Sequence, residues 1–242
     1  MTAIRVLHQF HAGEEQEERL LAYTRRLRKE TGCLEAEHYR SVVAPASIAV
    51  VELWEDQYLY GEHWARALEE AEPDVVLGAV SGRTQSGATS EFYRHEYYQP
   101  GRVWLPVAQQ GRTQKVFWPA AGAVRVLYQG SPADTDAVLE EVAEGVRETR
   151  REPGCLQFEW FRGTEFPGHV LVLELWQDQT AYDAHWLLRI STGSGGDGGE
   201  QAPRRQGTNG LEFYRGQEFT HLYDRWLPAD VARRSETVVW PG

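Results

Sequence analysis

Hydrophobic and polar positions in the first half of the chain alternate with the period of a strand and then of a helix. Residues 4–10 are rich in β-branched and large apolar side chains, which predicts a strand. Residues 14–30 place apolar side chains three and four positions apart, which predicts an amphipathic helix. Strands at 34–40 and 48–54 follow, then a helix with His63 and Trp64 and a final strand at 90–95.

The second half has the same order of patterns. It predicts a helix at 134–151, a second helix with His185 and Trp186, and four strands, at 124–129, 156–162, 170–176 and 211–216. Each half therefore gives strand, helix, strand, strand, helix, strand, which is the ferredoxin-like split βαβ unit. We expect an α+β fold built from two such units.

The two halves are also alike residue by residue. Gly-Cys-Leu at 32–34 returns 122 positions later at 154–156, and Glu-Leu-Trp at 52–54 returns at 174–176. Between 32 and 64, 15 of 33 positions are identical to their counterparts, which indicates an internal duplication. We predict domains at 1–121 and 122–242, and we expect Gly32 and Gly154 to cap the preceding helices.

A four-stranded sheet covered by helices on one face still has its other face to bury. Because both copies lie on one chain, we expect the repeats to form an intramolecular dimeric α+β barrel. The segments 96–122 and 217–242, each with two Trp-containing stretches, are predicted to wrap the partner repeat.

Composition excludes several classes of function. The net charge of −11 argues against nucleic acid or an anionic membrane as partner. Apolar stretches of about six residues fall far short of a membrane span, and the N-terminus lacks a signal-peptide pattern, so we expect a cytoplasmic protein. Two cysteines are too few for a disulfide scaffold or a cysteine-built zinc site, so no metal is expected.

Three recurrent motifs together resemble the antibiotic biosynthesis monooxygenase superfamily. They are Gly-Cys-Leu after the first helix, Glu-Leu-Trp-Glu/Gln-Asp-Gln at the end of the third strand, and a His nine residues after that Trp, at His63 and His185. The resemblance implies the dimeric ferredoxin-like α+β barrel. Tandem copies on a chain of this length look most like ring-opening oxygenases of angucycline pathways, of the jadomycin, gilvocarcin and kinamycin type. That likeness implies reduced flavin (FADH2 or FMNH2) as a diffusible cosubstrate, supplied by a separate flavin reductase.

Oxygenation of a phenol without a metal requires a base, flat apolar walls and exclusion of water. His63 and His185 are the candidate bases because imidazole titrates near neutral pH. Glu52 and Glu174 share a strand face with the neighbouring Trp residues and could orient the imidazole or a substrate hydroxyl. The alternatives are a local hydrogen bond for each histidine and a salt bridge to Arg94 or Arg215 for each glutamate.

Recurrent aromatic positions could sandwich a polycyclic substrate, and they could equally be core. The candidate substrate-binding residues are Trp54, Trp64, Tyr93, Trp176, Trp186, Tyr214, His38 and Trp160.

The copies differ in ways that favour one productive site over two. The first copy has five histidines and the second has three, with His8 replaced by Tyr128 and His38 by Trp160.

We therefore predict an oxygenase that acts on an aromatic polyketide phenol or hydroquinone with O2, most simply an angucycline ring opening with reduced flavin. The alternatives are a cofactor-independent anthrone or quinol monooxygenase and a non-catalytic binding protein. Haem degradation is disfavoured, because that branch of the superfamily uses an Asn where this chain has His8 or Gln9, and a Trp at the position of His63. A homodimer is compatible with the sequence.

Overall fold

The computed structural model describes residues 3–69, 89–94, 123–191, 200–215, 219–222 and 225–228. The chain divides into two compact units, one formed by Met1–His95 with Gln217–Arg234 and the other by Glu96–Gly216 with Ser235–Gly242. The predicted domain boundary near 121 and the predicted wrapping segment 96–122 lie outside the described residues.

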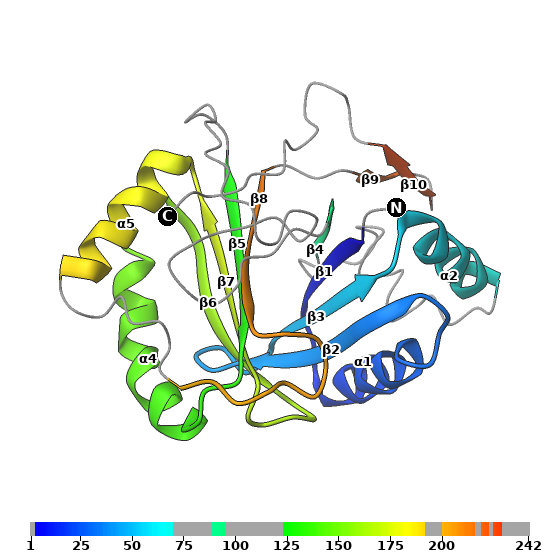
Figure 1. The fold of residues 1–242 in the computed structure, drawn as a ribbon, viewed down its shortest axis with the longest axis horizontal. Coiled ribbons are helices and arrows are strands. Elements are labelled where there is room, and N and C mark those ends of the chain that lie inside the picture. Colours follow the sequence, from blue (N-terminus) through cyan, green and yellow to red (C-terminus); the bar gives the residue numbers. More distant parts are fainter. Residues whose placement is uncertain are drawn as a thin grey trace. The chain divides into compact units, whose positions relative to one another are not determined.

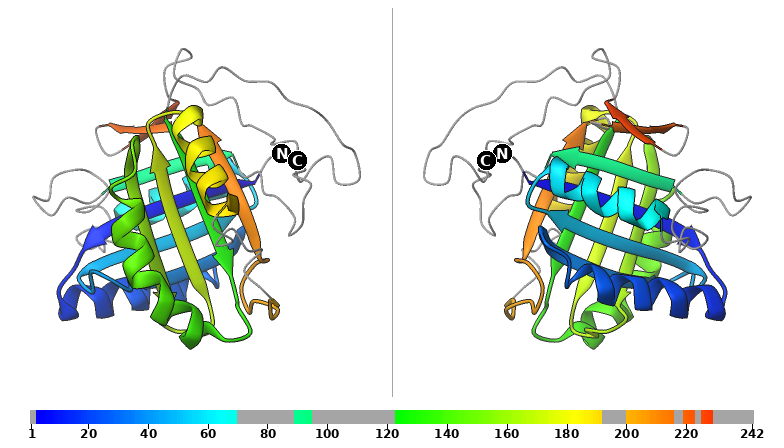
Figure 2. Two further views of the ribbon diagram at one scale, coloured as in Figure 1. Left: turned by 90° about the vertical axis from the view of Figure 1, so that its left-hand side faces the viewer. Right: turned by 90° about the vertical axis from the view of Figure 1, so that its right-hand side faces the viewer.

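The first repeat is a four-stranded antiparallel sheet with both helices on one face (Figures 1 and 2, right-hand view of Figure 2). The strands lie in the order β4-β1-β3-β2. The elements are β1 (Ile4–His11), α1 (Glu14–Leu27), β2 (Cys33–Ser41), β3 (Ser47–Trp54), α2 (Gln57–Glu69) and β4 (Thr89–Arg94).

The second repeat has the same architecture, with strand order β6-β7-β5-β8 and both helices on one face (left-hand view of Figure 2). Its elements are β5 (Val124–Gly130), α4 (Thr135–Thr149), β6 (Cys155–Gly163), β7 (Val170–Trp176), α5 (Gln179–Ser191) and β8 (Gly210–Arg215). The predicted α+β class, with two ferredoxin-like repeats, is therefore confirmed. In the part of the chain that the structure describes, no helix is both long enough and apolar enough to cross a membrane.

Two further short strands were not predicted from the sequence. β9 (Phe219–Leu222) and β10 (Arg225–Pro228) pair with each other in antiparallel register. They belong to the first compact unit although they follow the second repeat in the chain. Most of the predicted C-terminal wrapping segment 217–242 lies outside the described residues.

The core of the first repeat lies between its sheet and its helices. Because side chains alternate across a strand, one face of the sheet is turned to the helices. That helix-side face carries Val6 and Val50, which are buried in one apolar cluster with Leu20 and Leu27 of α1 and Trp64 of α2. Burial of this cluster holds both helices on the sheet.

The prediction that Gly32 and Gly154 cap the preceding helices is wrong. Both are turn residues four positions beyond the C-caps. The helices end earlier, with Arg28 and Arg150 at the C-cap positions. Both glycines have positive φ, 86° and 81°. A side-chain carbon at Gly32 would lie 2.6 Å from Leu59, so the turn needs glycine both for its backbone conformation and for its close approach to α2.

Candidate functional site

The predicted base His63 lies on α2, only 3% exposed, in the interior between sheet and helices. Its Nδ1 is 2.9 Å from Glu30 Oε2, and its Nε2 is 2.9 Å from the Tyr23 hydroxyl. Its ring stacks on Trp54 with 4.9 Å between centroids and 28° between planes. Nδ1–H donates to Glu30, and the Tyr23 hydroxyl is the hydrogen-bond partner of Nε2. We call Tyr23, Glu30, Glu52, Trp54 and His63 the first cluster.

The recurrent motifs explain how these residues meet. Asp56 Oδ1 accepts from Leu59 N at 2.9 Å, which caps α2 directly after β3 and carries His63 back over Trp54. The Gly32 turn is tied to the same point, because Glu55 N donates to Gly32 O at 2.8 Å. Glu30, two residues before that glycine, is thereby held beside the imidazole.

Glu52 is fully buried at the centre of the helix-side face. Its Oε2 accepts from the Trp54 indole at 2.8 Å, and its Oε1 lies 3.3 Å from His8 Nε2. Burial alone would raise the pKa of Glu52, but the contact with His8, the charge of His63 and the indole hydrogen bond together lower the pKa below its ordinary value. The predicted partner Arg94 has a side chain outside the described residues.

Two further first-cluster residues keep opposite protonation states. Burial, followed by the charge of Glu52, raises the pKa of Tyr23 well above its usual value, so the phenol keeps its proton. Burial opposes ionisation of Glu30, yet hydrogen bonds and charges from His63 and Arg66 lower its pKa. A neutral phenol and a carboxylate therefore flank the two ring nitrogens of His63.

The second repeat rebuilds the central contacts. His185 Nδ1 is 2.7 Å from Glu152 Oε2, and its ring lies 4.7 Å from that of Trp176 at 34°. The Trp176 indole donates to Glu174 Oε2 at 2.8 Å. We call Glu152, Glu174, Trp176 and His185 the second cluster.

The second cluster has no counterpart of the Tyr23 hydroxyl. Arg28 Nε donates to Ala36 O at 2.6 Å and Arg150 Nε donates to Phe158 O at 2.8 Å, which aligns α1 with α4 at an offset of 122. The counterpart of Tyr23 is therefore Gly145.

The second repeat also has a different residue, Tyr128, in place of His8. His8 pairs with Val50 in the sheet, and Tyr128 pairs with Val172 at the same place in the second repeat. The Tyr128 hydroxyl donates to Gln201 at 3.2 Å, so it does not reproduce the contact that His8 makes with Glu52.

These changes give the second cluster different acid–base properties. Burial raises the pKa of Glu174 to about 7, against the opposing effects of the Trp176 hydrogen bond and the Arg189 charge. Burial also lowers the pKa of His185, and the hydrogen bond and charge of Glu152 oppose this lowering. A carboxyl group with a raised pKa and an imidazole with a lowered pKa thus lie in one cluster, a feature of functional sites.

The other predicted aromatic residues are divided among three places. His38 and Trp160 lie opposite Val50 and Val172 in the sheet, on the helix-side faces of their repeats. Trp64 is buried in the core of the first repeat, whereas Trp186 is 39% exposed.

Tyr93 and Tyr214 lie on the opposite, helix-free faces, because their neighbours Phe92 and Phe213 pack toward the helices. They donate to Glu91 at 2.6 Å and to Glu212 at 2.5 Å. The structure therefore does not bring these two tyrosines to the histidines.

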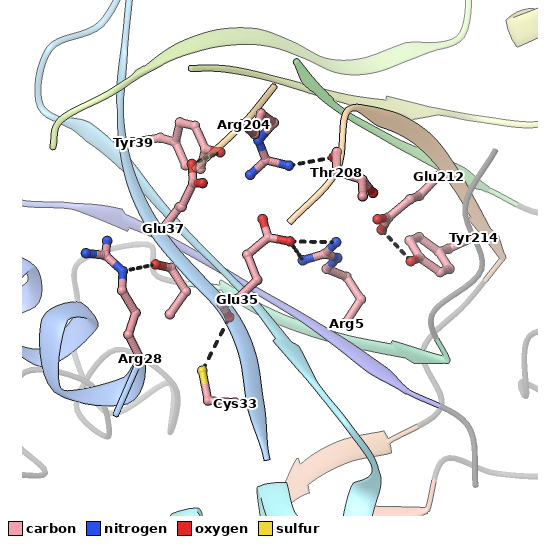
Figure 3. A network of polar contacts seen from close by, with 11 residues as sticks. Arg5, Arg28, Cys33, Glu35, Glu37, Tyr39, Arg204, Thr208, Glu212 and Tyr214 are labelled. Atoms are coloured by element: carbon pink, nitrogen blue, oxygen red, sulfur yellow. Dashed lines mark hydrogen bonds and ion pairs between the residues drawn. The ribbon is translucent and has the colours of Figure 1, made fainter. Parts of the chain in front are cut away.

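The helix-free face carries a buried polar network that was not predicted (Figure 3). In the first repeat Arg5 donates to Glu35 at 3.4 Å, and the Tyr39 hydroxyl donates to Glu37, with all four side chains at most 2% exposed. In the second repeat Arg125 donates instead to Gln157 at 2.8 Å. These side-chain contacts give the network a structural role on this face.

Sequence reasoning missed the residues that orient the histidines. Glu30 recurs as Glu152 two residues before each Gly-Cys-Leu, so the repeat contained the signal. Tyr23 carried no such signal, because it has no counterpart in the second copy. Among the described residues, no group of three or more His, Cys, Asp or Glu side chains is placed to hold a metal ion.

Several solved structures are similar to this chain. A solved structure of an anthrone oxidase-like protein is 13% identical, covering 87% of this chain and 91% of its own, with a TM-score of 0.33. A protein of Lactobacillus acidophilus provisionally assigned as a monooxygenase is 12% identical, covering 98% of this chain and 100% of its own, with a TM-score of 0.32. An antibiotic biosynthesis monooxygenase is 28% identical over 37% of this chain and 94% of its own, with a TM-score of 0.29.

No curated protein matches the chain. The family model for antibiotic biosynthesis monooxygenases, however, matches twice, at residues 4–69 and 122–186, which together make up more than half of the chain. Each match includes one cluster. The chain therefore belongs to the antibiotic biosynthesis monooxygenase family, which supports a general oxygenase role.

Proposed function

We propose that the chain is an oxygenase that oxidises a polycyclic phenol or hydroquinone of the aromatic polyketide class with O2. The observation that carries the proposal is the recurrent arrangement inside each repeat. A buried imidazole has its Nδ1 held by a carboxylate and its face on an indole, with a second carboxylate hydrogen-bonded to that indole.

The arrangement suits removal of a phenolic proton. With Nδ1–H donating to the carboxylate of Glu152, the lone pair of His185 Nε2 is available in the correct tautomer to accept a proton. The carboxylate then stabilises the imidazolium that forms. The substrate keeps the electron pair as a phenolate, which is far more readily oxidised than the phenol.

The aromatic walls support the same chemistry. Trp176 and Phe158 place their rings 4.7 and 5.6 Å from the His185 ring, so apolar surface adjoins the base. A low-polarity surrounding strengthens the interaction between the phenolate and the imidazolium that faces it.

An angucycline-type ring opening would need two electrons besides those of the substrate. Reduced flavin would supply both, so that one oxygen atom enters the substrate C–C bond and the other leaves as water. Arg189 on α5, whose charge acts on both His185 and Glu174, is a cation of the type that a flavin phosphate needs. We propose reduced flavin as a cosubstrate that binds and leaves with each turnover.

The same base favours a second candidate, cofactor-independent oxidation of an anthrone. There a ring CH2 becomes a carbonyl, O2 supplies its oxygen, and the second oxygen atom leaves as water with the two hydrogens, so no external electrons are required. The deprotonation step is identical in the two candidates.

Oxygen uptake separates these candidates. Purified protein would be incubated with 1,8-dihydroxyanthraquinone or 1,8-dihydroxy-9-anthrone, each with and without reduced flavin, while O2 and products are followed. The first candidate predicts a protein-dependent product only with reduced flavin, and turnover of the anthrone without flavin would favour the second. When His185→Gln is examined in the same assay, the matched control is His11→Ala, which removes an exposed histidine. Absence of a protein-dependent product in every arm would contradict an oxygenase and favour a binding protein.

A further inference from the structure

The interiors of the two repeats are packed to different degrees. In the first repeat Glu52 is fully buried, Leu20 is fully buried and His38 is 2% exposed. Their counterparts Glu174, Val142 and Trp160 are only partly buried. The same contrast holds at Trp64, 5% exposed, and Trp186, 39% exposed.

Tyr23 shows what fills the first interior. Its side chain is itself a phenol, and its hydroxyl lies 2.9 Å from His63 Nε2 inside the apolar cluster. Because His63 Nδ1 is already held by Glu30, the tyrosine occupies the one ring nitrogen that could act as a base. The first repeat thus contains a built-in phenol at the position where a substrate phenol would donate its proton.

The second repeat has Gly145 in place of Tyr23. At Gly145 an added side-chain carbon would meet no atom within 4 Å, apart from adjacent residues and the helix backbone, among the residues that the structure describes. Glycine in the middle of a helix costs about 1 kcal/mol relative to alanine. The glycine at this position of α4 therefore lowers stability, and it omits the side chain that contacts His63 in the first repeat.

The carboxylates of Glu52 and Glu174 also differ in their contacts. In the first repeat Glu52 is committed to His8, 3.3 Å away, and to Trp54. In the second repeat Glu174 keeps the contact with the indole of Trp176. Tyr128, which stands in place of His8, donates to Gln201. Glu174 is partly exposed and lies on the same helix-side face as the half-buried Trp160.

From this geometry we infer that only the second repeat binds substrate, and that the first repeat is a closed copy in which Tyr23 and His8 occupy the places of the substrate's polar groups. The inference rests on the proposed function and deepens it. The ligand is a polycyclic diphenol. One hydroxyl lies where the Tyr23 hydroxyl lies in the first repeat, within hydrogen-bond distance of His185 Nε2. A second oxygen function faces Glu174, in the place that His8 takes beside Glu52.

The proton transfer that follows is simple. The O–H bond of the first hydroxyl breaks, an N–H bond forms at His185 Nε2, and the electron pair stays on the phenolate oxygen. Nothing in this step requires O2 or flavin, so it can be observed by binding alone.

The test is binding of 1,8-dihydroxyanthraquinone to the full chain, measured by calorimetry and by the absorbance of its phenolate. We expect one equivalent per chain, with a red-shifted phenolate band. Gly145→Tyr should weaken binding more than tenfold and abolish the band. The matched control is Gly61→Tyr, the same substitution at an exposed glycine of α2 that also has open space around it, and it should leave both readouts unchanged.

Several outcomes would overturn the inference. They are two equivalents per chain, no binding, and equal binding by Gly145→Tyr and wild type. The wild-type stoichiometry requires no variant, so the inference stays testable if Gly145→Tyr does not fold. One equivalent that is bound as phenolate but never oxygenated would support the inference and contradict the proposed oxygenase. Oxygenation that persists in Gly145→Tyr would do the reverse.

Discussion

At the scale of single residues, the second cluster pairs a neutral base with an acid that is poised to titrate. Its behaviour depends on burial more than on any one partner, since burial is the main cause of the changed pKa of both Glu174 and His185. The groups that also act on Glu174 are Trp176, Arg189, Glu152 and Arg125. Such tuning is how one fold offers acid and base catalysis at the same pH.

Replacing Glu174 should change how stability depends on pH. The folded-state pKa of about 7 lies above the ordinary 4.5, so the native state holds a proton that the unfolded state releases between these values. The stability associated with that proton is complete below pH 4.5 and is lost as pH rises through 7. Glu174→Gln, which keeps an acceptor for Trp176, should therefore gain about 1–3 kcal/mol relative to wild type between pH 5 and pH 8.

Urea unfolding of both proteins at the two pH values measures this difference. Parallel changes in the unfolding free energy of wild type and Glu174→Gln would contradict a raised pKa at this residue.

Glu152 should act on the base through its charge. Glu152→Gln keeps a hydrogen bond to His185 Nδ1 but removes the charge that stabilises the imidazolium, so we expect a loss of roughly 10²-fold in kcat, the low end of general-base contributions. The pH dependence of kcat should also change. Glu141→Gln, on the exposed side of α4, serves as the control. Equal activity of the two variants would show that the carboxylate has no such role.

At the scale of elements, the duplicated Gly turn and the Asp caps set the position of each histidine against its carboxylate. Gly154 has φ of 81°, and a side-chain carbon there would lie 2.5 Å from Ala181. Its carbonyl also accepts from Gln177 N at 2.7 Å, as Gly32 does from Glu55. The Gly-Cys-Leu motif is therefore a structural device that places Glu152 beside α5.

The two glycines of the second repeat should respond oppositely to alanine. In Gly154→Ala an alanine must adopt the left-handed backbone conformation of this turn and contact Ala181 closely. The free energy of unfolding should therefore fall by about 1–2 kcal/mol or more. Gly145→Ala fills open space in a helix and should gain about 0.5–1 kcal/mol. Urea unfolding of the two variants tests the contrast. Similar free energies of unfolding for both variants would contradict the roles given to these two glycines.

Much of this element order could be predicted from the sequence, because each copy supported the assignments in the other. The predicted first helix ran three residues too far, to Glu30, because helical charge spacing continues into the turn that begins at Arg28. β9 and β10 were missed because strands of four residues show almost no periodicity.

The site was predictable only where it recurs. His63, Glu52 and Trp54 were found because their counterparts repeat them. Tyr23 lies within the predicted helix at 14–30, and only the fold reveals that its hydroxyl meets His63. Which copy is closed could not be read from the sequence, because it depends on which side chains fill one three-dimensional interior.

At the scale of the whole molecule, duplication explains how one copy could change without loss of the fold. Each repeat keeps four strands, two helices and the Trp–carboxylate contact. The intramolecular barrel remains a prediction from the sequence. The first compact unit also includes Gln217–Arg234, so it draws on the far end of the chain.

Cutting the chain near Gly122 should therefore damage both halves. Each fragment would expose the helix-free face of its sheet, and the first would lose β9 and β10 as well. We expect insoluble or self-associating fragments when 1–121 and 122–242 are expressed separately and examined by size-exclusion chromatography. Two well-behaved monomers would contradict an obligate pair of repeats.

The central claim is that a base in the second repeat acts on a phenol while the corresponding residue of the first is structural. The most direct measurement is kcat for oxygen-dependent turnover in His185→Gln and His63→Gln, each compared with wild type on the substrate found by the oxygen-uptake screen. We expect a loss of roughly 10²-fold or more for His185→Gln. We expect a change of at most about threefold in folded His63→Gln. Equal losses in both variants, or a loss confined to His63→Gln, would contradict it.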